Sequence, residues 1–258
     1  MSPDTDADKG TALVIGGSGG IGAVICDVLA GHGWGIALTY HSNAARAEQA
    51  ADAVRHRGRR ALACALNLES PEAAPALIAR VEAEFGRLDT LVYAAGPLVE
   101  LVHLSRTDPA QMERHLMQDT LGFFRVVHAA LPALRRTQGS VVACHSAAQY
   151  RYAPADGLSI VPKAGVSAIV AGIAKEEGRF GIRANGVGIG LIEAGQMEAL
   201  TASGNIDATY LEAAARATPL RRAGKPEDIA EAVAFFADPA RAGFVTGQNI
   251  SVDGGYSV

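Results

Sequence analysis

Two hydroxyls and one ammonium group are spaced in this chain so that they could act together on a substrate oxygen. Ser146 precedes Ser159 by thirteen residues, and Lys163 follows Ser159 by four, within Leu158-Ser159-Ile160-Val161-Pro162-Lys163. Serine hydroxyls donate hydrogen bonds, and the lysine supplies a fixed positive charge. An aliphatic hydroxyl is a far weaker acid than a phenol, whose pKa is about 10. The set can polarise an oxygen, but it lacks an evident proton donor.

A glycine-rich turn near the N-terminus indicates a site for a pyrophosphate. A predicted strand, Ala12–Ile15, runs into Gly16-Gly17-Ser18-Gly19-Gly20-Ile21-Gly22, and a predicted helix follows. These glycines satisfy G-x-G-x-x-G when read from Gly17 and G-x-x-x-G-x-G when read from Gly16. Glycine lets the backbone approach an anion, and the helix N-terminus offers free N–H groups. The segment therefore predicts a dinucleotide-binding loop.

The end of the second predicted strand favours NADP(H) over NAD(H). It reads Thr39-Tyr40-His41-Ser42-Asn43, and no acidic residue follows until Glu48. An Asp or Glu at this point would bind the ribose 2′-hydroxyl of NAD. His41, Ser42 and Arg46 are suited instead to a 2′-phosphate, although a histidine is mostly neutral at neutral pH. The serine or asparagine of this segment can also cap the next helix, which is compatible with a phosphate contact.

Strand-like and helix-like patterns alternate along the chain without a linker. The predicted strands are Ala12–Ile15, Gly35–Tyr40, Arg60–Leu66, Thr90–Ala94, Ser140–His145, Arg183–Val187 and Asn249–Val252. The predicted helices are Gly20–Gly31, Ala44–Arg57, Glu72–Phe85, Ala110–Arg136, Lys163–Gly178 and Pro226–Ala237. This alternation predicts one α/β domain over residues 11–258: a Rossmann-type, doubly wound parallel sheet of about seven strands with helices on both faces. The less regular residues 195–218 are expected to form a substrate-side lid.

Composition narrows the class of protein further. The chain has 258 residues and a formal net charge of −4, and it shows no basic stripe, which argues against a nucleic-acid partner. Its three cysteines are far apart and form no metal-binding pattern, so we expect reduced thiols, no metal and a cytoplasmic location. Residues 1–10 are polar and acidic and are expected to be a disordered tail rather than a signal peptide. No uncharged apolar stretch of about 18 residues predicts a membrane span.

Over roughly residues 10–258 the chain resembles the classical short-chain dehydrogenase/reductases. The matching segments are the glycine loop, Leu91-Val92-Tyr93-Ala94-Ala95-Gly96, Gly139–Val142, Ser146, Lys163–Val166, Gly181–Asn185 and Thr246–Gly255. The resemblance implies a homotetramer, in which the helices 110–136 and 163–178 pair at one interface and residues 249–258 pack at another. It also implies cofactor contacts from Gly16, Ser18, Gly20, Ile21, His41, Ser42, Asn67, Leu68, Ala95, Gly96, Lys163 and Ile192.

The departures from this family cluster where the chemistry occurs. Ser159 stands where a usual member has its proton-donating Tyr, and Asp119 stands where a helix Asn holds a relay water. The 2,4-dienoyl-CoA reductases also place Ser four residues before the Lys and take the proton from a Tyr on the loop after the fifth strand. The corresponding loop here offers Tyr152 and then Tyr150, although the dienoyl position itself is an alanine, and ordinary packing would equally explain both tyrosines. A phenol beside Lys163 is expected to have a lowered pKa.

Three further departures lie close to the cofactor. Tyr93 replaces the Asn of the N-A-G segment, Ile189 replaces a Pro after the sixth strand, and Ala194 replaces a Thr that grips the carboxamide. His145 and Asp156 are weaker proton-donor candidates than the two tyrosines.

Two functions fit this pattern. The first is an NADP(H)-dependent reductase of an oxo or conjugated enoyl group, for example on an acyl thioester. The missing Tyr favours conjugated substrates modestly. In these, the carbon that takes the proton is not the carbon that accepts hydride, and it is protonated after hydride transfer. The second is a nucleotide-binding protein without turnover, acting as a sensor or scaffold subunit. An intact glycine loop is expected under both.

Overall fold

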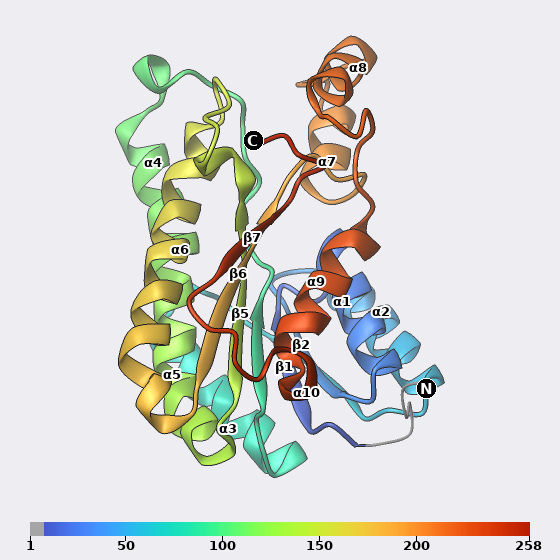
Figure 1. Cartoon of the computed structure of the whole chain (residues 1–258), viewed down its shortest axis with the longest axis vertical. Coiled ribbons are helices and arrows are strands. Elements are labelled where there is room, and N and C mark those ends of the chain that lie inside the picture. Colours follow the sequence, from blue (N-terminus) through green and yellow to red (C-terminus); the bar gives the residue numbers. More distant parts are fainter. Residues whose placement is uncertain (1–7) are drawn as a thin grey trace.

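The computed structural model describes residues 8–258 and contains one parallel sheet of seven strands (Figure 1). The strand order is β3-β2-β1-β4-β5-β6-β7. All strands are parallel, but the direction in which successive strands are added to the sheet reverses between β1 and β4. The strands are β1 (Thr11–Ile15), β2 (Gly35–Tyr40), β3 (Ala61–Ala65), β4 (Thr90–Tyr93), β5 (Ser140–Ser146), β6 (Arg183–Ile189) and β7 (Asn249–Val252). The predicted fold class is confirmed. At such a reversal, two crossovers diverge and leave a crevice for a ligand at the carboxyl ends of the strands.

Helices cover both faces of the sheet, as the nearly continuous apolar strands require. They are α1 (Gly20–Gly31), α2 (Ala44–His56), α3 (Ala73–Phe85), α4 (Pro109–His115), α5 (Gly122–Thr137), α6 (Gly157–Glu177), α7 (Gln196–Ala202), α8 (Ala208–Ala217), α9 (Pro226–Ala237) and α10 (Pro239–Ala242). One core cluster joins the sheet to α1, α2 and α9, and a second joins it to α3, α5 and α6. The two layers lie on opposite sides of the sheet in Figure 1.

The helix that carries Lys163 begins earlier than predicted. It starts at Gly157, so Ser159 and Lys163 both lie on α6, four residues apart and on one face. Pro162 lies inside this helix and has no N–H to offer the carbonyl of Leu158. The buried side chain of His115 lies close to this point of the helix.

The long helix predicted over residues 110–136 is interrupted. Between α4 and α5, residues Leu116–Leu121 form a π-helical segment, which inserts one extra residue per turn. Asp119 lies within this segment and is only 2% exposed. The interruption thus coincides with a residue close to the predicted chemistry.

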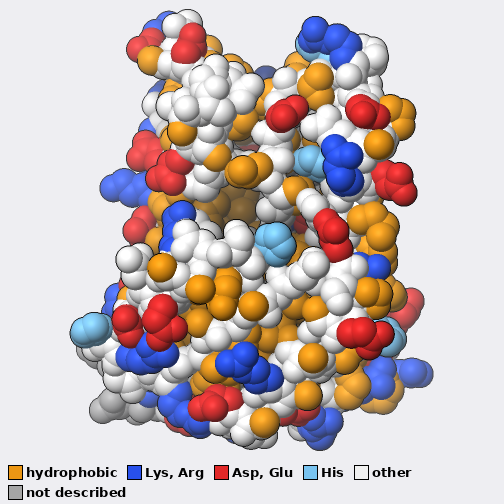
Figure 2. All heavy atoms as spheres, turned by 180° about the vertical axis from the view of Figure 1, so that it is seen from behind, with side chains coloured by type: hydrophobic (Ala, Val, Ile, Leu, Met, Phe, Trp, Pro, Cys, Tyr) orange, Lys and Arg blue, Asp and Glu red, His pale blue; other side chains and the backbone are white. Residues whose placement is uncertain are grey.

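The predicted lid is more regular than its composition suggested. Residues 195–218 contain the short helices α7 and α8, which project beyond the carboxyl ends of the strands (Figure 1). Seen from behind, the molecule is hollowed between this projection and the opposite one, and hydrophobic side chains line the hollow (Figure 2).

The N-terminal tail lies largely outside the described residues, which begin at Asp8. Lys9 already forms an ion pair with Asp238, ahead of β1. The stretch Gly157–Phe180 is long and apolar enough to cross a membrane by length and composition, although the sequence analysis predicted no such stretch. It packs on β5 and β6 and contributes Val166 and Val170 to the core.

Candidate active site

The glycine loop is tight because two of its glycines cannot be replaced without strain. Gly16 has a φ of +80°, a conformation that residues with a Cβ rarely adopt. A Cβ on Gly22 would lie 2.2 Å from the carbonyl oxygen of Gly16. The loop is also tied to β2, since the N–H of Gly16 donates to Thr39 Oγ1 over 2.9 Å. The first turn of α1 is left facing the crevice as a ready site for an anion.

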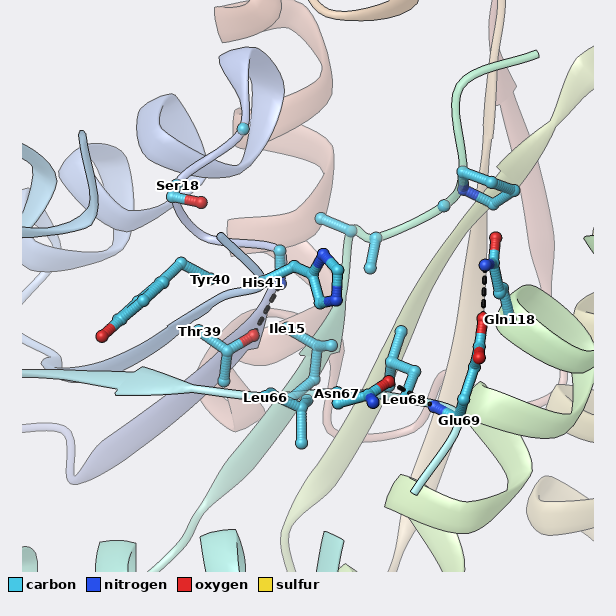
Figure 3. A pocket seen from close by; sticks show the side chains of 16 residues that line it. Ile15, Ser18, Thr39, Tyr40, His41, Leu66, Asn67, Leu68, Glu69 and Gln118 are labelled. Carbon is cyan, nitrogen blue, oxygen red and sulfur yellow. Dashed lines mark hydrogen bonds between the residues drawn. The ribbon is translucent and has the colours of Figure 1, made fainter. Parts of the chain in front are cut away.

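A cavity of about 300 Å³ lies beside this loop, at the carboxyl ends of β1, β2, β3 and β4 (Figure 3). Seven of the predicted cofactor residues line it: Gly16, Ser18, His41, Asn67, Leu68, Ala95 and Gly96. Figure 3 shows His41 turned into the cavity from the end of β2. The structure therefore brings together residues from four separate strand ends, which is the shape that an extended dinucleotide requires.

The remaining predicted cofactor residues lie around the cavity without lining it. Gly20 and Ile21 form the first turn of α1. Ser42 is exposed after β2, where Asn43 caps α2 by accepting a hydrogen bond from the N–H of Arg46 over 2.9 Å. The capping role therefore falls to the asparagine. Ile192 is buried beyond β6, next to the start of the lid.

Lys163 is anchored by one group on the loop after β4 and by another on the π-helical segment. Its Nζ donates to the carbonyl oxygen of Ala95 over 2.7 Å and to Asp119 Oδ1 over 3.0 Å. It also lies 5.2 Å from the centre of the Tyr93 ring. Two of its three N–H bonds are thus committed, which leaves one for a ribose hydroxyl. The sequence analysis singled out Asp119 and Tyr93 as departures but did not foresee this contact.

Tyr93 contacts both Lys163 and Asp119 from the end of β4. Its side chain is fully buried, and its hydroxyl donates to the main-chain carbonyl of Asp119 over 3.2 Å. Burial, and then the nearby charge of Asp119, raise the pKa of Tyr93 well above its usual value. The phenol is therefore neutral at every physiological pH, and it donates to a carbonyl that also accepts a hydrogen bond from the backbone N–H of Gly122.

The two serines lie at the carboxyl end of β5 and on the first turn of α6. Ser146 Oγ accepts a hydrogen bond from the N–H of Ala148 over 3.2 Å, which fixes the serine at the end of the strand. Ser159 is half-buried, and its hydroxyl makes no hydrogen bond to the described part of the chain. Its hydroxyl is free to meet a substrate.

The candidate phenols occupy different places. Tyr152 is 48% exposed, and its hydroxyl lies 3.0 Å from where a Cβ on Gly157 would stand, at the start of α6. Tyr150 packs edge-on against His145, and its phenol lies near Ser167. Burial raises the pKa of Tyr150. The expectation of a pKa lowered by Lys163 is wrong for this residue, because its phenol lies by Ser167 and loses more hydration than it gains from any charge.

Two other ionisable groups border the site. His145 bonds to Asn249 through Nε2 over 3.0 Å and to Gln149 through Nδ1 over 2.6 Å. Burial lowers its pKa, so the ring is neutral. Asp156 precedes α6, and burial raises its pKa to about 7. A carboxyl group with this pKa is protonated for part of the physiological range and is able to supply a proton there.

The start of α7, within the predicted lid, contacts the loop after β4. The side chain of Gln196 accepts a hydrogen bond from the N–H of Val99 over 3.1 Å and also donates to the carbonyl of Pro97. A Cβ on Gly20 would lie 2.9 Å from the backbone nitrogen of Gly195. Nothing in the sequence signalled this contact, because Gln196 and Val99 are far apart along the chain. No cluster of metal-binding side chains occurs within residues 8–258.

The reversal of strand order, the glycine turn and the adjoining cavity together define a dinucleotide-binding α/β protein. Comparison with known proteins narrows the class. Residues 16–257 match the family model described as enoyl-(acyl carrier protein) reductase. A 3-oxoacyl-[acyl-carrier-protein] reductase FabG of Staphylococcus aureus is 30% identical, over 95% of this chain and 97% of the relative.

Two other matches show how wide this group is. A cis-4-hydroxycyclohexanecarboxylate dehydrogenase of Sinomonas cyclohexanicum is 33% identical, over 95% of this chain and 96% of the relative. A short-chain type dehydrogenase/reductase from Mycobacterium ulcerans has a similar structure, with a TM-score of 0.89, 27% identity and coverage of 97% of this chain and 90% of that one. The chain belongs to the short-chain dehydrogenase/reductase family and is related to its oxidoreductases.

Proposed function

We propose that this protein is an NADP(H)-dependent reductase that transfers hydride to an oxo or conjugated enoyl group of an acyl thioester. The observation that carries the proposal is the convergence of the glycine loop, the cavity beside it and Lys163 on the carboxyl ends of neighbouring strands. The named relatives act on oxoacyl thioesters or carry out related oxidations and reductions. The protein would therefore bring together a dinucleotide and an acyl substrate.

Three features of the described residues support a preference for NADP(H). His41 points into the cavity, Ser42 is not used as a helix cap, and Arg46 is exposed on the first turn of α2. An acidic residue that would repel a 2′-phosphate is absent from the described end of β2. The acidic residue that does line the cavity, Glu69, follows β3 and accepts a hydrogen bond from Gln118.

The residues present would fit a nicotinamide dinucleotide, because the cavity is bordered by the glycine loop and by residues at the carboxyl ends of four neighbouring strands. A bound NADPH would supply the hydride. Lys163 would hold a ribose hydroxyl with its remaining N–H. Ser146 and Ser159 would donate hydrogen bonds to the substrate oxygen and hold the acceptor carbon in place. The lid would exclude water from the crevice.

The proton would come from a group near the start of α6. Tyr152 is our first candidate because its hydroxyl lies at that point and remains accessible, and Tyr150 is the second. Asp156 is a third, since burial raises its pKa to about 7. For a conjugated enoyl substrate, water is also an adequate source, because the carbon is protonated after hydride transfer.

A second function is favoured by one observation. Both Asp119 and the carbonyl of Ala95 hold the ammonium group of Lys163, so the usual activation of a neighbouring acid is weakened. A protein that binds the nucleotide without turnover would tolerate this arrangement. NADPH fluorescence titration followed by a panel of enoyl and oxo thioesters separates the two functions. Tight binding with NADPH consumption supports the reductase, and tight binding with no consumption across the panel supports the sensor or scaffold.

A further inference from the structure

The ion pair between Lys163 and Asp119 is sheltered from water. The side chain of Lys163 is 15% exposed and that of Asp119 is 3% exposed. Gly96 leaves the pair just enough room, because a Cβ there would lie 3.3 Å from Lys163 Nζ and 3.4 Å from Asp119 Oδ2. Because both charged groups are largely buried, water screens them poorly, and the electrostatic interaction between the carboxylate and the ammonium is strong.

Among the described residues, Asp119 has no ion-pair partner besides Lys163. Within residues 8–258, Lys163 is the cationic side chain that forms an ion pair with this carboxylate. Tyr93 reaches the same residue, but its phenol is neutral and donates to the main-chain carbonyl. The negative charge of Asp119 is therefore balanced by Lys163, and the positive charge of Lys163 is balanced by Asp119.

This balance changes what Lys163 can do for a neighbouring acid. An unpaired cation within about 4–6 Å lowers the pKa of an acidic group by about 1–3. A cation held 3.0 Å from a carboxylate oxygen acts as a dipole, whose field falls off much faster with distance than that of a single charge. Position 159, one turn earlier on α6, therefore faces a lysine whose charge is largely cancelled.

We propose that Asp119 cancels the activating charge of Lys163 and thereby makes the site selective for conjugated enoyl thioesters over isolated ketones. The proposal rests on the reductase function proposed above. Asp119 is a positioning residue, because it acts on the reaction only through Lys163. Tyr93 supports it by holding the π-helical turn from which the carboxylate projects.

The selectivity follows from where each reaction needs its proton. A ketone that receives hydride at the carbonyl carbon develops negative charge on the adjacent oxygen, which must take a proton from an acid beside it. In an enoyl thioester, hydride adds to the β-carbon and the electron pair of the double bond moves toward the thioester oxygen as an enolate. A proton then forms the new bond at the α-carbon. The enoyl thioester, NADPH and one proton thus give the saturated thioester and NADP⁺, without an activated acid at the hydride acceptor.

The first test measures the charge of Lys163 without any turnover. In the 258-residue chain, Ser159→Tyr introduces a phenol next to Lys163, and Ser159→Phe provides the matched ring without a hydroxyl. The difference in ultraviolet tyrosinate absorbance between the two variants gives the titration of the introduced phenol alone. With Asp119 present, we expect this phenol to titrate as an ordinary tyrosine. With Asp119→Asn added to both variants, its midpoint should fall by about one pH unit or more. An identical midpoint in both backgrounds overturns the proposal.

The second test measures selectivity. The ratio of kcat/KM for an oxo thioester to that for an enoyl thioester should rise about tenfold or more from Ser159→Tyr to Ser159→Tyr with Asp119→Asn, matching one pH unit in acidity. An unchanged ratio, with both substrates turned over, contradicts the selectivity. Asp119→Ser repeats both tests if the asparagine variant does not fold. If no variant consumes NADPH with any thioester, the reductase function fails, while the titration still decides whether Asp119 cancels the charge.

Discussion

The side chain of Gln196 joins α7 to the backbone N–H of Val99, 3.1 Å away, on the loop that follows β4. The same side chain donates to the carbonyl of Pro97, which lines the cavity beside the glycine loop. One residue therefore links α7 to the border of this cavity. If residues 195–218 act as the expected lid, their closure and the retention of a nucleotide should be coupled through it.

Replacing Gln196 with alanine should speed the release of NADPH. Two hydrogen bonds are lost, each worth about 0.5–1.5 kcal/mol, so the dissociation rate should rise by about fivefold to a hundredfold. Stopped-flow fluorescence of bound NADPH measures this rate. Gln49→Ala, on the exposed face of α2, is the matched control and should leave it unchanged. Equal rates in all three proteins would show that the lid does not retain the nucleotide.

Arg46→Ala should weaken NADPH and leave NADH almost unaffected. A charged hydrogen bond to a 2′-phosphate contributes about 1.5–3 kcal/mol, so the Kd for NADPH should increase at least about tenfold. Because NADH lacks this phosphate, it serves as the control within the same variant. Fluorescence titration with both nucleotides checks the result. If the unaltered protein binds NADH as tightly as NADPH, the cofactor preference itself is wrong.

Tyr152→Phe should lower turnover while leaving the affinity for NADPH unchanged. Loss of a general acid typically reduces the rate about 10²–10⁴-fold, and we expect at least the lower figure. Tyr150→Phe is the matched variant, and its effect should be smaller because burial raises the pKa of that phenol and makes it a weaker acid. Steady-state kinetics with thioester substrates measures both. Full activity in both variants would eliminate the displaced tyrosine and leave Asp156 or water as the source of the proton.

Asp156 should make the protein less stable as the pH rises. Its pKa is about 7 in the folded chain, above the ordinary value of 3.8, because burial disfavours the ionised carboxyl. The folded state therefore loses stability relative to the unfolded state between these two values. Asp156→Asn should raise Tm above pH 7 and leave it unchanged near pH 4. Thermal melts across this range, with Glu198→Gln on the exposed face of α7 as control, provide the measurement. A constant difference in Tm at all pH values would contradict the shifted pKa.

The protein should form a homotetramer. We expect one interface through the helices within residues 110–136 and 163–178, and another through residues 249–258. Phe124 on α5 is 46% exposed, and further exposed apolar surface comes from Leu116 and Met117 on the π-helical segment and from Val161 on α6. Phe124→Asp should therefore reduce the assembly to smaller species. Phe244→Asp is the control, because Phe244 is fully exposed but lies outside both expected interfaces. Light scattering at micromolar concentration compares the variants, and a monomeric unaltered protein would rule out the tetramer.

Local patterns were enough to predict the sheet, the glycine turn and most helices. Each of these depends on apolar periodicity or on residues that are adjacent in sequence, as in Gly16–Gly22. The prediction placed the start of this helix at Lys163, whereas α6 begins at Gly157 and contains Pro162. The pairing of Lys163 with Asp119, 44 residues away, depends on the π-helical turn, which no local pattern signals. The chemistry of the site was thus the part least accessible to sequence alone.

The π-helical turn between α4 and α5 also bears on how such a site can arise or disappear. Each residue of an α-helix advances the chain by about 100° around the helix axis. Deleting one residue from Leu116–Leu121 would restore a regular helix and turn its two halves relative to each other by about that angle. The carboxylate of Asp119 would then move away from Lys163, although neither residue had been substituted. A single codon lost or gained in this turn is therefore sufficient to switch the lysine between a paired and an unpaired state during the divergence of related enzymes.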